Sequence, residues 1–239
     1  MNPPRIVAIE TSGPRGSLAL GVGDACVGEA EFAARTEHAR ELFPSLDALC
    51  QRCGWPPGAP DECYVSIGPG SFTGLRVAVT VARHLALAGG TKVVAVPSMD
   101  VIAANVGGKD GGPERLVVFL HARAGEVFAA GYQRGDGAFR RVVEPTMGPP
   151  QRALADWSAP FGVVGEGAAM YRVLIESCGG AALDEALWWP RAVNVLRIGR
   201  RLALAGKYTP ARALTPFYLR RPEAEEVWAK RAGGGCAED

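Results

Sequence analysis

The stretch SIGPGSFTGLRVAVTVARHLALAGG, residues 66–90, decides how this sequence folds. An apolar run of the kind that forms a buried strand ends at Ile67. Gly68-Pro69-Gly70 then forces a sharp turn, and Ser71 is a good N-cap for a helix that ends just before Gly89-Gly90. A Gly-rich turn between a strand and a helix either holds a phosphate or fixes where the helix starts. Because no lysine follows the turn, we favour the second use.

On both sides of this stretch, the apolar patterns change between strand and helix. Three short apolar runs separated by glycine-containing breaks indicate an antiparallel meander, and the 3.6-residue spacing after them indicates an amphipathic helix. The expected order is strands at 6–10, 17–22 and 26–32, a helix at 37–53, a strand at 63–67, the helix from Ser71, a strand at 92–96 and a short helix capped by Ser98. This order predicts a mixed sheet covered by helices, the ribonuclease-H-like plan.

A flexible Gly-rich linker at 107–112 separates this unit from a second, shorter copy. The copy is expected to have strands at 116–120, 127–132 and 139–144, a helix containing Leu154, a strand at 162–165, and helices at 170–178 and 194–205. Two copies of one unit predict an α/β protein with the duplicated, two-lobed fold of the actin-like ATPases, its second lobe reduced. We therefore divide the chain into a first lobe at 1–106, a second lobe with the C-terminal helix at 107–221, and a flexible tail at 222–239.

The composition of the 239-residue chain argues against several classes of protein. A net charge of +1 gives no global attraction to nucleic acid or to an anionic membrane, and no apolar run reaches the roughly 18 residues of a membrane span. The N-terminus leads directly into a strand without a signal-peptide pattern, so we expect a cytoplasmic protein with reduced thiols. Cys50 and Cys53 form a C-x-x-C with Cys63 ten residues on, which indicates either a metal or redox site or one face of a helix end. Because no second C-x-x-C follows, we expect no metal.

The turns that would face the cleft between the lobes hold an incomplete set of groups for phosphoryl transfer. In the first lobe, the candidates for contact with a nucleotide or phosphate are Glu10, Thr11, Ser12, Arg15, Gly70 and Ser71. His121 is the second-lobe equivalent of Glu10, and a neutral imidazole is a poor ligand for Mg²⁺. The sequence also lacks an H-E-x-x-H motif and a G-x-x-x-x-G-K-[ST] loop. The turns are therefore either a scaffold or a weak nucleotide site, and an actin-fold small-molecule kinase or ATPase is the alternative function.

Six segments, in chain order, resemble the bacterial TsaB family, also known as YeaZ: IVAIETSGPRGSLAL, EHARELFPSLDALC, SIGPGSFTGLRVAVTVARHLALA, VVAVPSMDVIA, HARAGEVFAAGY and PFYLRR. The resemblance runs from about Ile6 to Arg220, and G-P-G-S-F-T-G-[LV]-R is its most specific string. It implies a non-catalytic subunit that acts with TsaD and the small ATPase TsaE when threonylcarbamoyl is transferred to N6 of adenosine 37 in tRNAs that read ANN codons. Glu10 and His121 depart from the family pattern, which usually has Asp at both positions.

The resemblance also separates this chain from its catalytic relatives, which carry an H-x-E-x-H metal motif. Residues 97–103 contain no histidine, so we expect no bound metal, no catalysis and no peptidase activity of the M22 or glycoprotease type. A carbamoyl transferase or metalloprotease is the weakest alternative. The resemblance implies no cofactor on this chain alone, with ATP or ADP at the interface with the partner left open. It further implies a heterodimer with TsaD, a homodimer in its absence, contact with tRNA through the complex, and no membrane association.

TsaB-like proteins pair through two helices of the first lobe, which correspond to the helices at 37–53 and from Ser71. The candidate interface residues are His38, Leu42, Phe43, Leu46, Phe72, Leu75, Arg76, Val79, Thr80 and Arg83. Of these, Arg76, Thr80 and Arg83 form a polar stripe at helical spacing and are expected to face outward.

A second stripe on the same helix consists of small residues. Gly74, Ala78 and Ala82 recur every four residues and permit close approach of another element. The sequence leaves open whether that element is a partner helix or the protein's own sheet.

Overall fold

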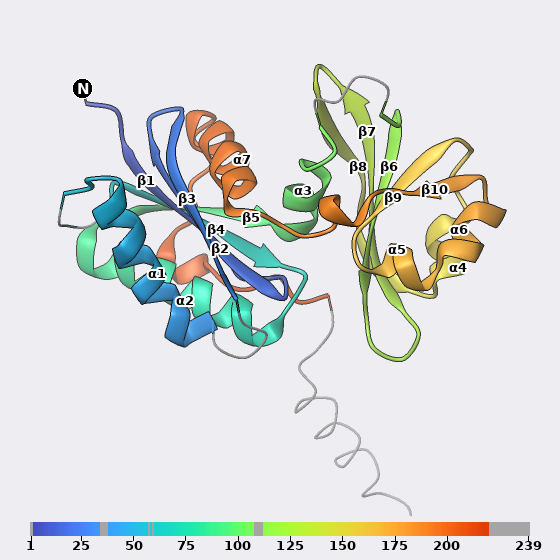
Figure 1. The fold of residues 1–239 in the computed structure, drawn as a ribbon, viewed down its shortest axis with the longest axis horizontal. Helices are drawn as coiled ribbons and strands as arrows, with labels where there is room; N and C mark the ends of the chain where they lie inside the picture. The colour runs from blue at the N-terminus through green and yellow to red at the C-terminus, as the bar shows by residue number, and fades with distance from the viewer. Residues whose placement is uncertain (1, 34–37, 57, 59, 108–111, 220–239) are drawn as a thin grey trace, which may run out of the picture.

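The computed structural model describes residues 2–33, 38–56, 58, 60–107 and 112–219. The chain forms two lobes, each built on a five-stranded mixed sheet with helices packed against it (Figure 1). The predicted fold class, an α/β protein with a duplicated ribonuclease-H-like plan, is confirmed. The predicted tail at 222–239 lies outside the described residues. Among the described residues, no helix is both long enough and apolar enough to cross a membrane.

The first sheet has the strand order β3-β2-β1-β4-β5. Its strands are β1 (Arg5–Glu10), β2 (Arg15–Val22), β3 (Ala25–Ala33), β4 (Glu62–Gly68) and β5 (Lys92–Pro97). The pairs β1–β2 and β2–β3 are antiparallel and form the predicted meander, whereas β1–β4 and β4–β5 are parallel. Parallel neighbours require crossover connections, which α1 (His38–Arg52) and α2 (Phe72–Gly89) supply.

This sheet has an apolar core on each face, because successive residues of a strand point to opposite sides. Val7 and Ile9 lie in the core under α1 and α2. Ile6 and Ala8 lie in the core on the other face, under α3 (Ser98–Ala103) and α7 (Ala192–Leu204) (Figure 1). The helices of the first lobe therefore form two layers around one sheet.

Ser98 was predicted to cap the short helix α3 but is its first residue, and Pro97 is the N-cap. The Ser98 hydroxyl is used elsewhere, in a buried 2.9 Å hydrogen bond to the hydroxyl of Ser66. This bond ties the start of α3 to the end of β4.

The last helix, α7, packs on the first lobe, so the predicted boundary that placed it in the second lobe is wrong. Ala192, Val195 and Leu196 belong to the same core as Ile6. Close packing is possible because Gly199 has no side chain: a Cβ there would lie 2.5 Å from the ring of Tyr64. An amphipathic pattern shows that a helix has an apolar side but not which sheet that side covers, and the sequence therefore did not identify the correct lobe.

The second sheet has the strand order β10-β9-β6-β7-β8. Its strands are β6 (Arg115–His121), β7 (Val127–Gly135), β8 (Ala138–Gly148), β9 (Phe161–Val164) and β10 (Gly180–Ala182). The remaining helices are α4 (Pro150–Leu154), α5 (Gly167–Met170), α6 (Arg172–Ser177) and the 3-10 turns η1 (Glu185–Leu187) and η2 (Ala211–Ala213). The predicted helix at 170–178 is present as the shorter α6, and the short helix α5 precedes it. β10 was missed because Gly-Ala-Ala carries no apolar alternation.

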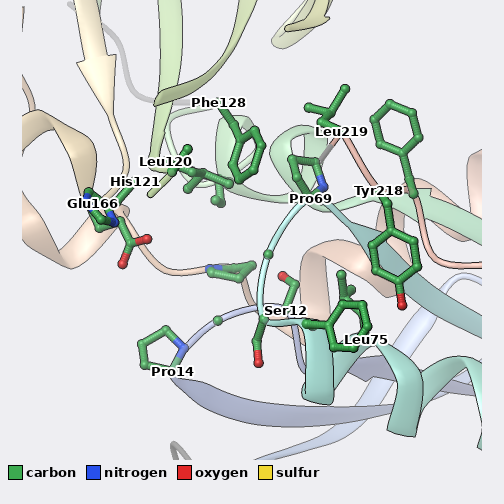
Figure 2. Close-up of a pocket in the computed structure, with 18 of the residues that line it drawn as sticks. Ser12, Pro14, Pro69, Leu75, Leu120, His121, Phe128, Glu166, Tyr218 and Leu219 are labelled. Atoms are coloured by element: carbon green, nitrogen blue, oxygen red, sulfur yellow. The ribbon is translucent and has the colours of Figure 1, made fainter. Parts of the chain in front are cut away.

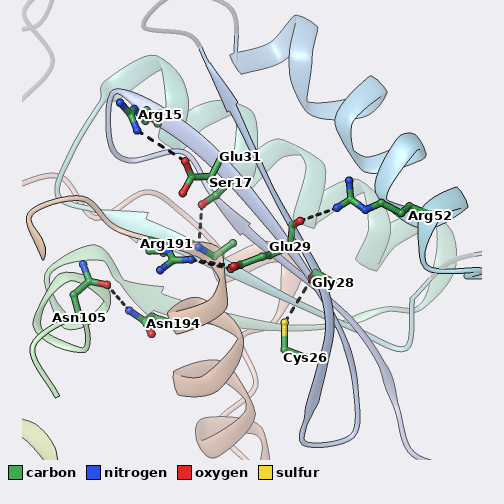
Figure 3. Close-up of polar contacts among 11 residues, drawn as sticks. Arg15, Ser17, Cys26, Gly28, Glu29, Glu31, Arg52, Asn105, Arg191 and Asn194 are labelled. Atoms are coloured by element: carbon green, nitrogen blue, oxygen red, sulfur yellow. Dashed lines mark hydrogen bonds and ion pairs between the residues drawn. The ribbon is translucent and has the colours of Figure 1, made fainter. Parts of the chain in front are cut away.

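Asn105, just after α3, connects the two lobes. Its side-chain amide donates to the carbonyl oxygens of Leu187 at 2.9 Å and Trp189 at 2.8 Å, in the segment that leaves the second lobe. Its Oδ1 accepts a 2.7 Å hydrogen bond from Asn194 of α7 (Figure 3). The Asn105 side chain therefore links the two segments in which the chain passes from one lobe to the other.

Asp100 of α3 makes a second connection between the lobes. Its Oδ1 accepts from the hydroxyl of Tyr132 at 2.8 Å and forms a 3.2 Å ion pair with Arg141, both on the second sheet. Burial raises the pKa of Asp100, and the charge of Arg141 opposes that shift. Together with the Asn105 contacts, this pair fixes the second lobe against α3 and α7.

Candidate functional site

The turn after β4 docks the start of α2 against the turn after β1. The Ser71 hydroxyl accepts from the backbone N–H of Gly74 at 3.3 Å, as an N-cap does, and the Ser71 N–H donates to the carbonyl of Ser12 at 2.7 Å. A Cβ on Gly70 would lie 2.4 Å from the Ser12 carbonyl oxygen, and one on Gly74 would lie 1.9 Å from that of Thr11. The glycines of this string therefore let two backbone segments touch, which fixes where α2 begins.

A cleft of about 820 Å³ lies between the lobes at this turn. Its first-lobe wall includes Ser12, Pro14, Pro69, Gly70, Ser71 and Leu75. Its second-lobe wall includes Leu120, His121, Arg123, Phe128, Glu166 and Trp189 (Figure 2). Phe217, Tyr218 and Leu219 close it from a third side. Most of these side chains are apolar, and the charged residues that line the cleft are Arg76, Arg123 and Glu166.

Only half of the predicted nucleotide contacts lie at this cleft. Ser12, Gly70 and Ser71 line it, whereas Glu10, Thr11 and Arg15 do not. Arg15 is exposed and lies 4.0 Å from Glu31 on the neighbouring strand (Figure 3). The Thr11 hydroxyl is buried and donates to the carbonyl of Gly74 at 2.7 Å. The Thr11 side chain therefore ties the turn after β1 to α2, whereas Arg15 lies on the surface of the meander.

Glu10 is fully buried at the end of β1. Its Oε1 accepts from the Ser12 N–H at 2.5 Å, and its Oε2 has no hydrogen-bond partner among the described residues. Burial raises the pKa of this carboxyl group, because the charged form loses its hydration. A buried carboxyl group with a raised pKa is a poorer magnesium ligand than an exposed carboxylate.

The cysteines noted in the sequence do not assemble a site in the described part of the chain, where no group of three or more His, Cys, Asp or Glu could hold a metal. Cys53 at the end of α1 lies against β3, with its thiol 3.5 Å from the Val27 carbonyl oxygen. Burial raises the pKa of Cys50 and raises that of Cys63, inside the sheet, to about 12. The C-x-x-C thus belongs to the packing of α1 on the sheet.

The outward faces of α1 and α2 form the candidate docking surface, which we define as Phe43, Phe72, Arg76, Thr80 and Arg83. All five side chains are exposed, and the two helices lie side by side on one face of the first sheet (Figure 1). Phe43 is 57% exposed, which is a large apolar area to leave in water. His38 begins α1, but its side chain lies outside the described residues.

Three residues predicted for this interface are instead core residues of the lobe. Leu42, Leu75 and Val79 are 0%, 1% and 4% exposed, because they occupy the sheet-facing sides of the two helices. Leu46 is half-buried against the same core. The prediction was wrong for the first three because sequence spacing does not separate the sheet-facing apolar side from an apolar partner-facing side.

The small-residue stripe of α2 also packs inside the lobe. Gly74, Ala78 and Ala82 are buried, and the two alanines belong to the core under α1 and α2. Of the two partners left open by the sequence, the stripe therefore contacts the protein's own first lobe.

A C-terminal strap, residues 205–219, links the docking surface to the cleft and was not predicted. The Thr209 N–H donates to the Val93 carbonyl at 2.7 Å, and the Phe217 N–H donates to the Ile67 carbonyl at 2.7 Å, so the strap follows the sheet toward the cleft. Tyr218 then lies beside α2. The sequence contains a hint of this role, because PFYLRR has three large apolar or aromatic residues outside any periodic pattern.

Tyr218 completes an aromatic and cationic stack at the start of α2. The Arg76 guanidinium carbon lies 3.8 Å from the ring centroid of Phe72, and Arg76 Nε donates to the Tyr218 hydroxyl at 3.3 Å. The rings of Phe72 and Tyr218 are 5.1 Å apart and tilted by 31°. Arg76 is thereby held in place, whereas Arg83, two turns along α2, has no ion pair with any described residue.

Comparisons with known proteins point to one family. Residues 31–228 match the family model described as "TsaD: tRNA N6-adenosine threonylcarbamoyltransferase". The chain is 30% identical to the tRNA threonylcarbamoyladenosine biosynthesis protein TsaB of Bacillus subtilis over 93% of this chain and 97% of that protein, and 27% identical to the protein of the same name from Escherichia coli over 96% and 99%. The crystal structure of YeaZ from Pseudomonas aeruginosa matches with a TM-score of 0.78 at 27% identity, covering 90% of this chain and all of the other. The sequence string, the two-lobed fold and the near-complete coverage together show that the chain belongs to the TsaB (YeaZ) family.

Proposed function

We propose that this protein is a non-catalytic subunit of the machinery that makes threonylcarbamoyladenosine in tRNA. In this proposal it acts with a TsaD homologue and a TsaE-like ATPase in the transfer of threonylcarbamoyl to N6 of adenosine 37 in ANN-decoding tRNAs. Family membership supports the biosynthetic role. The observation that carries the subunit role is the exposed surface of Phe43, Phe72, Arg76, Thr80 and Arg83 on two adjacent helices.

This surface has the composition of a protein interface. Aromatic residues and arginine are enriched at interfaces, where a ring fills a pocket and a guanidinium makes several directed hydrogen bonds. The Phe72–Arg76–Tyr218 stack holds three such side chains in one arrangement before a partner binds, which lowers the entropy lost on association. The same surface would pair with a second copy when TsaD is absent.

The cleft favours this role over that of a kinase or ATPase. Its first-lobe wall offers hydroxyls, backbone amides and the Arg76 side chain, whereas Glu10 is buried below it and Arg15 lies beside Glu31, away from the cleft. We propose that the chain alone holds no nucleotide, and that any ATP or ADP is bound at the interface with the partner. The proposed location is the cytoplasm, where tRNA is modified, and the chain would meet tRNA within the complex.

Titration of the protein with the TsaD homologue tests the docking surface. Arg83→Glu should weaken the 1:1 complex at least about tenfold, because it places a like or unmatched charge in the interface. Arg172→Glu is the matched control, since Arg172 is exposed on α6 of the second lobe. Equal affinity for Arg83→Glu and the wild type, or an equal loss for both variants, would show that TsaD binds elsewhere.

A further inference from the structure

The segment that carries α7 is basic throughout. Residues 186–219 contain six arginines and lysines and no aspartate or glutamate, although the whole chain has a net charge of only +1. Acidic residues that could neutralise this segment must therefore come from other parts of the fold. Some basic residues of this segment have an acidic partner from another part of the fold, and others do not.

Two of the arginines are neutralised by the meander. Arg191, just before α7, forms a 3.0 Å ion pair with Glu29 of β3 (Figure 3). Arg200 forms a 2.7 Å ion pair with Asp24 in the turn between β2 and β3. These contacts fasten the two ends of α7 to the edge of the first sheet, which is a structural role.

Four other basic residues have no such partner among the described residues: Arg212 in η2, and three residues on or just after α7. Arg197, Arg201 and Lys207 are exposed, and none of them forms an ion pair within the part of the chain that the structure describes. Arg201 has an electrostatic interaction with Asp100, but the Asp100 carboxylate already forms a 3.2 Å ion pair with Arg141. Arg197 and Arg201 are four residues apart and share one face of α7, and Lys207 follows the end of the helix. We call these three residues the α7 basic surface.

The α7 basic surface lies on the opposite side of the first sheet from the docking surface. The cores under α1–α2 and under α7 use alternate residues of the same strands, and the ribbon shows the helices on the two sides (Figure 1). Burial of α1 and α2 against a partner would therefore leave this surface open to solvent. An exposed row of unpaired cations is complementary to a second, anionic partner.

We infer that the α7 basic surface binds the sugar-phosphate backbone of tRNA while the protein is docked to TsaD through α1 and α2. This inference rests on the proposed function, which supplies an RNA as the substrate of the assembled complex. Phosphates are the anions that such a surface fits best: they recur at regular spacing, and guanidinium groups bind them through paired N–H donors. Arg197 and Arg201 project from successive turns of one helix face, so they can contact neighbouring phosphates of one strand. Because these contacts read no bases, they would position the tRNA without selecting its sequence.

The test is the salt dependence of tRNA binding by the complex of this protein with TsaD, measured with a transcribed ANN-reading tRNA. Each phosphate contact adds about 0.9 to the slope of log affinity against log salt, so Arg197→Ala/Arg201→Ala/Lys207→Ala should reduce the slope by about two to three. Arg191→Ala/Arg200→Ala is the matched control, because it removes cations of the same segment that already have carboxylate partners. It should reduce the slope by less than about one. Arg197→Lys/Arg201→Lys keeps the charges and should keep the slope.

An unchanged slope for the triple variant would overturn the inference, and so would equal losses for the triple variant and the control. A triple variant that binds TsaD more weakly but leaves the tRNA slope unchanged would overturn it in favour of an acidic protein surface as the partner. These results are distinguishable from failure of the proposed function. That function fails if omission of the whole protein leaves tRNA modification unchanged, whatever the salt slope.

Discussion

Gly74→Ala is the substitution that tests most directly how the turn at 68–71 positions α2. In an exposed helix this change is stabilising by about 1 kcal/mol, because alanine is the better helix former. Here the new Cβ would lie 1.9 Å from the Thr11 carbonyl oxygen, closer than any real Cβ contact. The helix or the turn after β1 must therefore shift, and the 2.7 Å hydrogen bond from the Thr11 hydroxyl to the Gly74 carbonyl is strained with it.

Overpacking costs about 1–3 kcal/mol, and an approach of 1.9 Å to a backbone atom places this case at about 2–3 kcal/mol, against a gain of about 1 kcal/mol in helix propensity. We expect a net loss of about 1–2 kcal/mol in the free energy of unfolding, or a fall of about 2–8 °C in Tm for a chain of this length. Urea and thermal unfolding of the purified protein measure both. Gly148→Ala is the control, since a Cβ on Gly148 meets nothing within 4 Å. A Gly74→Ala protein as stable as the wild type, or more stable, would show that the turn after β1 does not restrict the side chain at this position.

Three further predictions concern groups that the sequence alone did not explain. Glu10→Gln should stabilise the protein at pH 7. Burial raises the pKa of Glu10 above its unfolded value, so the stability that the protonated carboxyl group gives is fully present below about pH 4.5 and is lost as the pH rises through the folded pKa. Glutamine does not ionise and should avoid this loss. Urea unfolding between pH 4.5 and 8 should show a smaller decline for the variant, and identical pH profiles would contradict this. Asn105→Ala should cost about 1–3 kcal/mol in calorimetric unfolding, because two carbonyl oxygens and Asn194 lose their partner; a loss below about 0.5 kcal/mol would show that Asn105 does not join the lobes. Tyr218→Ala should cost about 1 kcal/mol or more and Tyr218→Phe about half that or less, since phenylalanine keeps the ring against Phe72 and loses only a 3.3 Å hydrogen bond; equal losses would mean that the ring stack contributes nothing.

The sequence allowed the first lobe to be predicted almost element by element, because its signals are local. Alternating apolar runs, the Ser71 cap and the glycines at 89–90 each act within a few residues, and α2 begins and ends where they predict. The caps of α2 are a clear case: Ser71 accepts from Gly74, and Gly90 adopts the left-handed conformation that ends the helix.

What the sequence did not reveal depends on contacts between distant segments. The apolar side of α7 would fit either sheet, and its contacts in the folded protein, including the close approach of Gly199 to Tyr64, show which one it covers. Likewise, Leu75 and Phe72 are both apolar residues near the start of α2, yet one is buried and the other is 37% exposed. Glu10 had the spacing of a cleft residue, but its carboxyl group turns into the protein, where the Ser12 N–H binds it. Spacing along a chain determines which residues share a face of a helix or strand, while the tertiary fold determines what packs against that face.

We propose that this protein is required as a subunit although it does no chemistry itself. Reconstitution of tRNA modification from purified TsaD, the TsaE-like ATPase, the threonylcarbamoyl donor and an ANN-reading tRNA tests it, with this protein present, omitted, or replaced by its Arg83→Glu and Glu10→Gln variants. We predict modification only when the protein is present, a loss with Arg83→Glu that a higher concentration of the variant restores, and full activity with Glu10→Gln. Undiminished modification without the protein, or loss of activity through Glu10→Gln with TsaD binding intact, would contradict it.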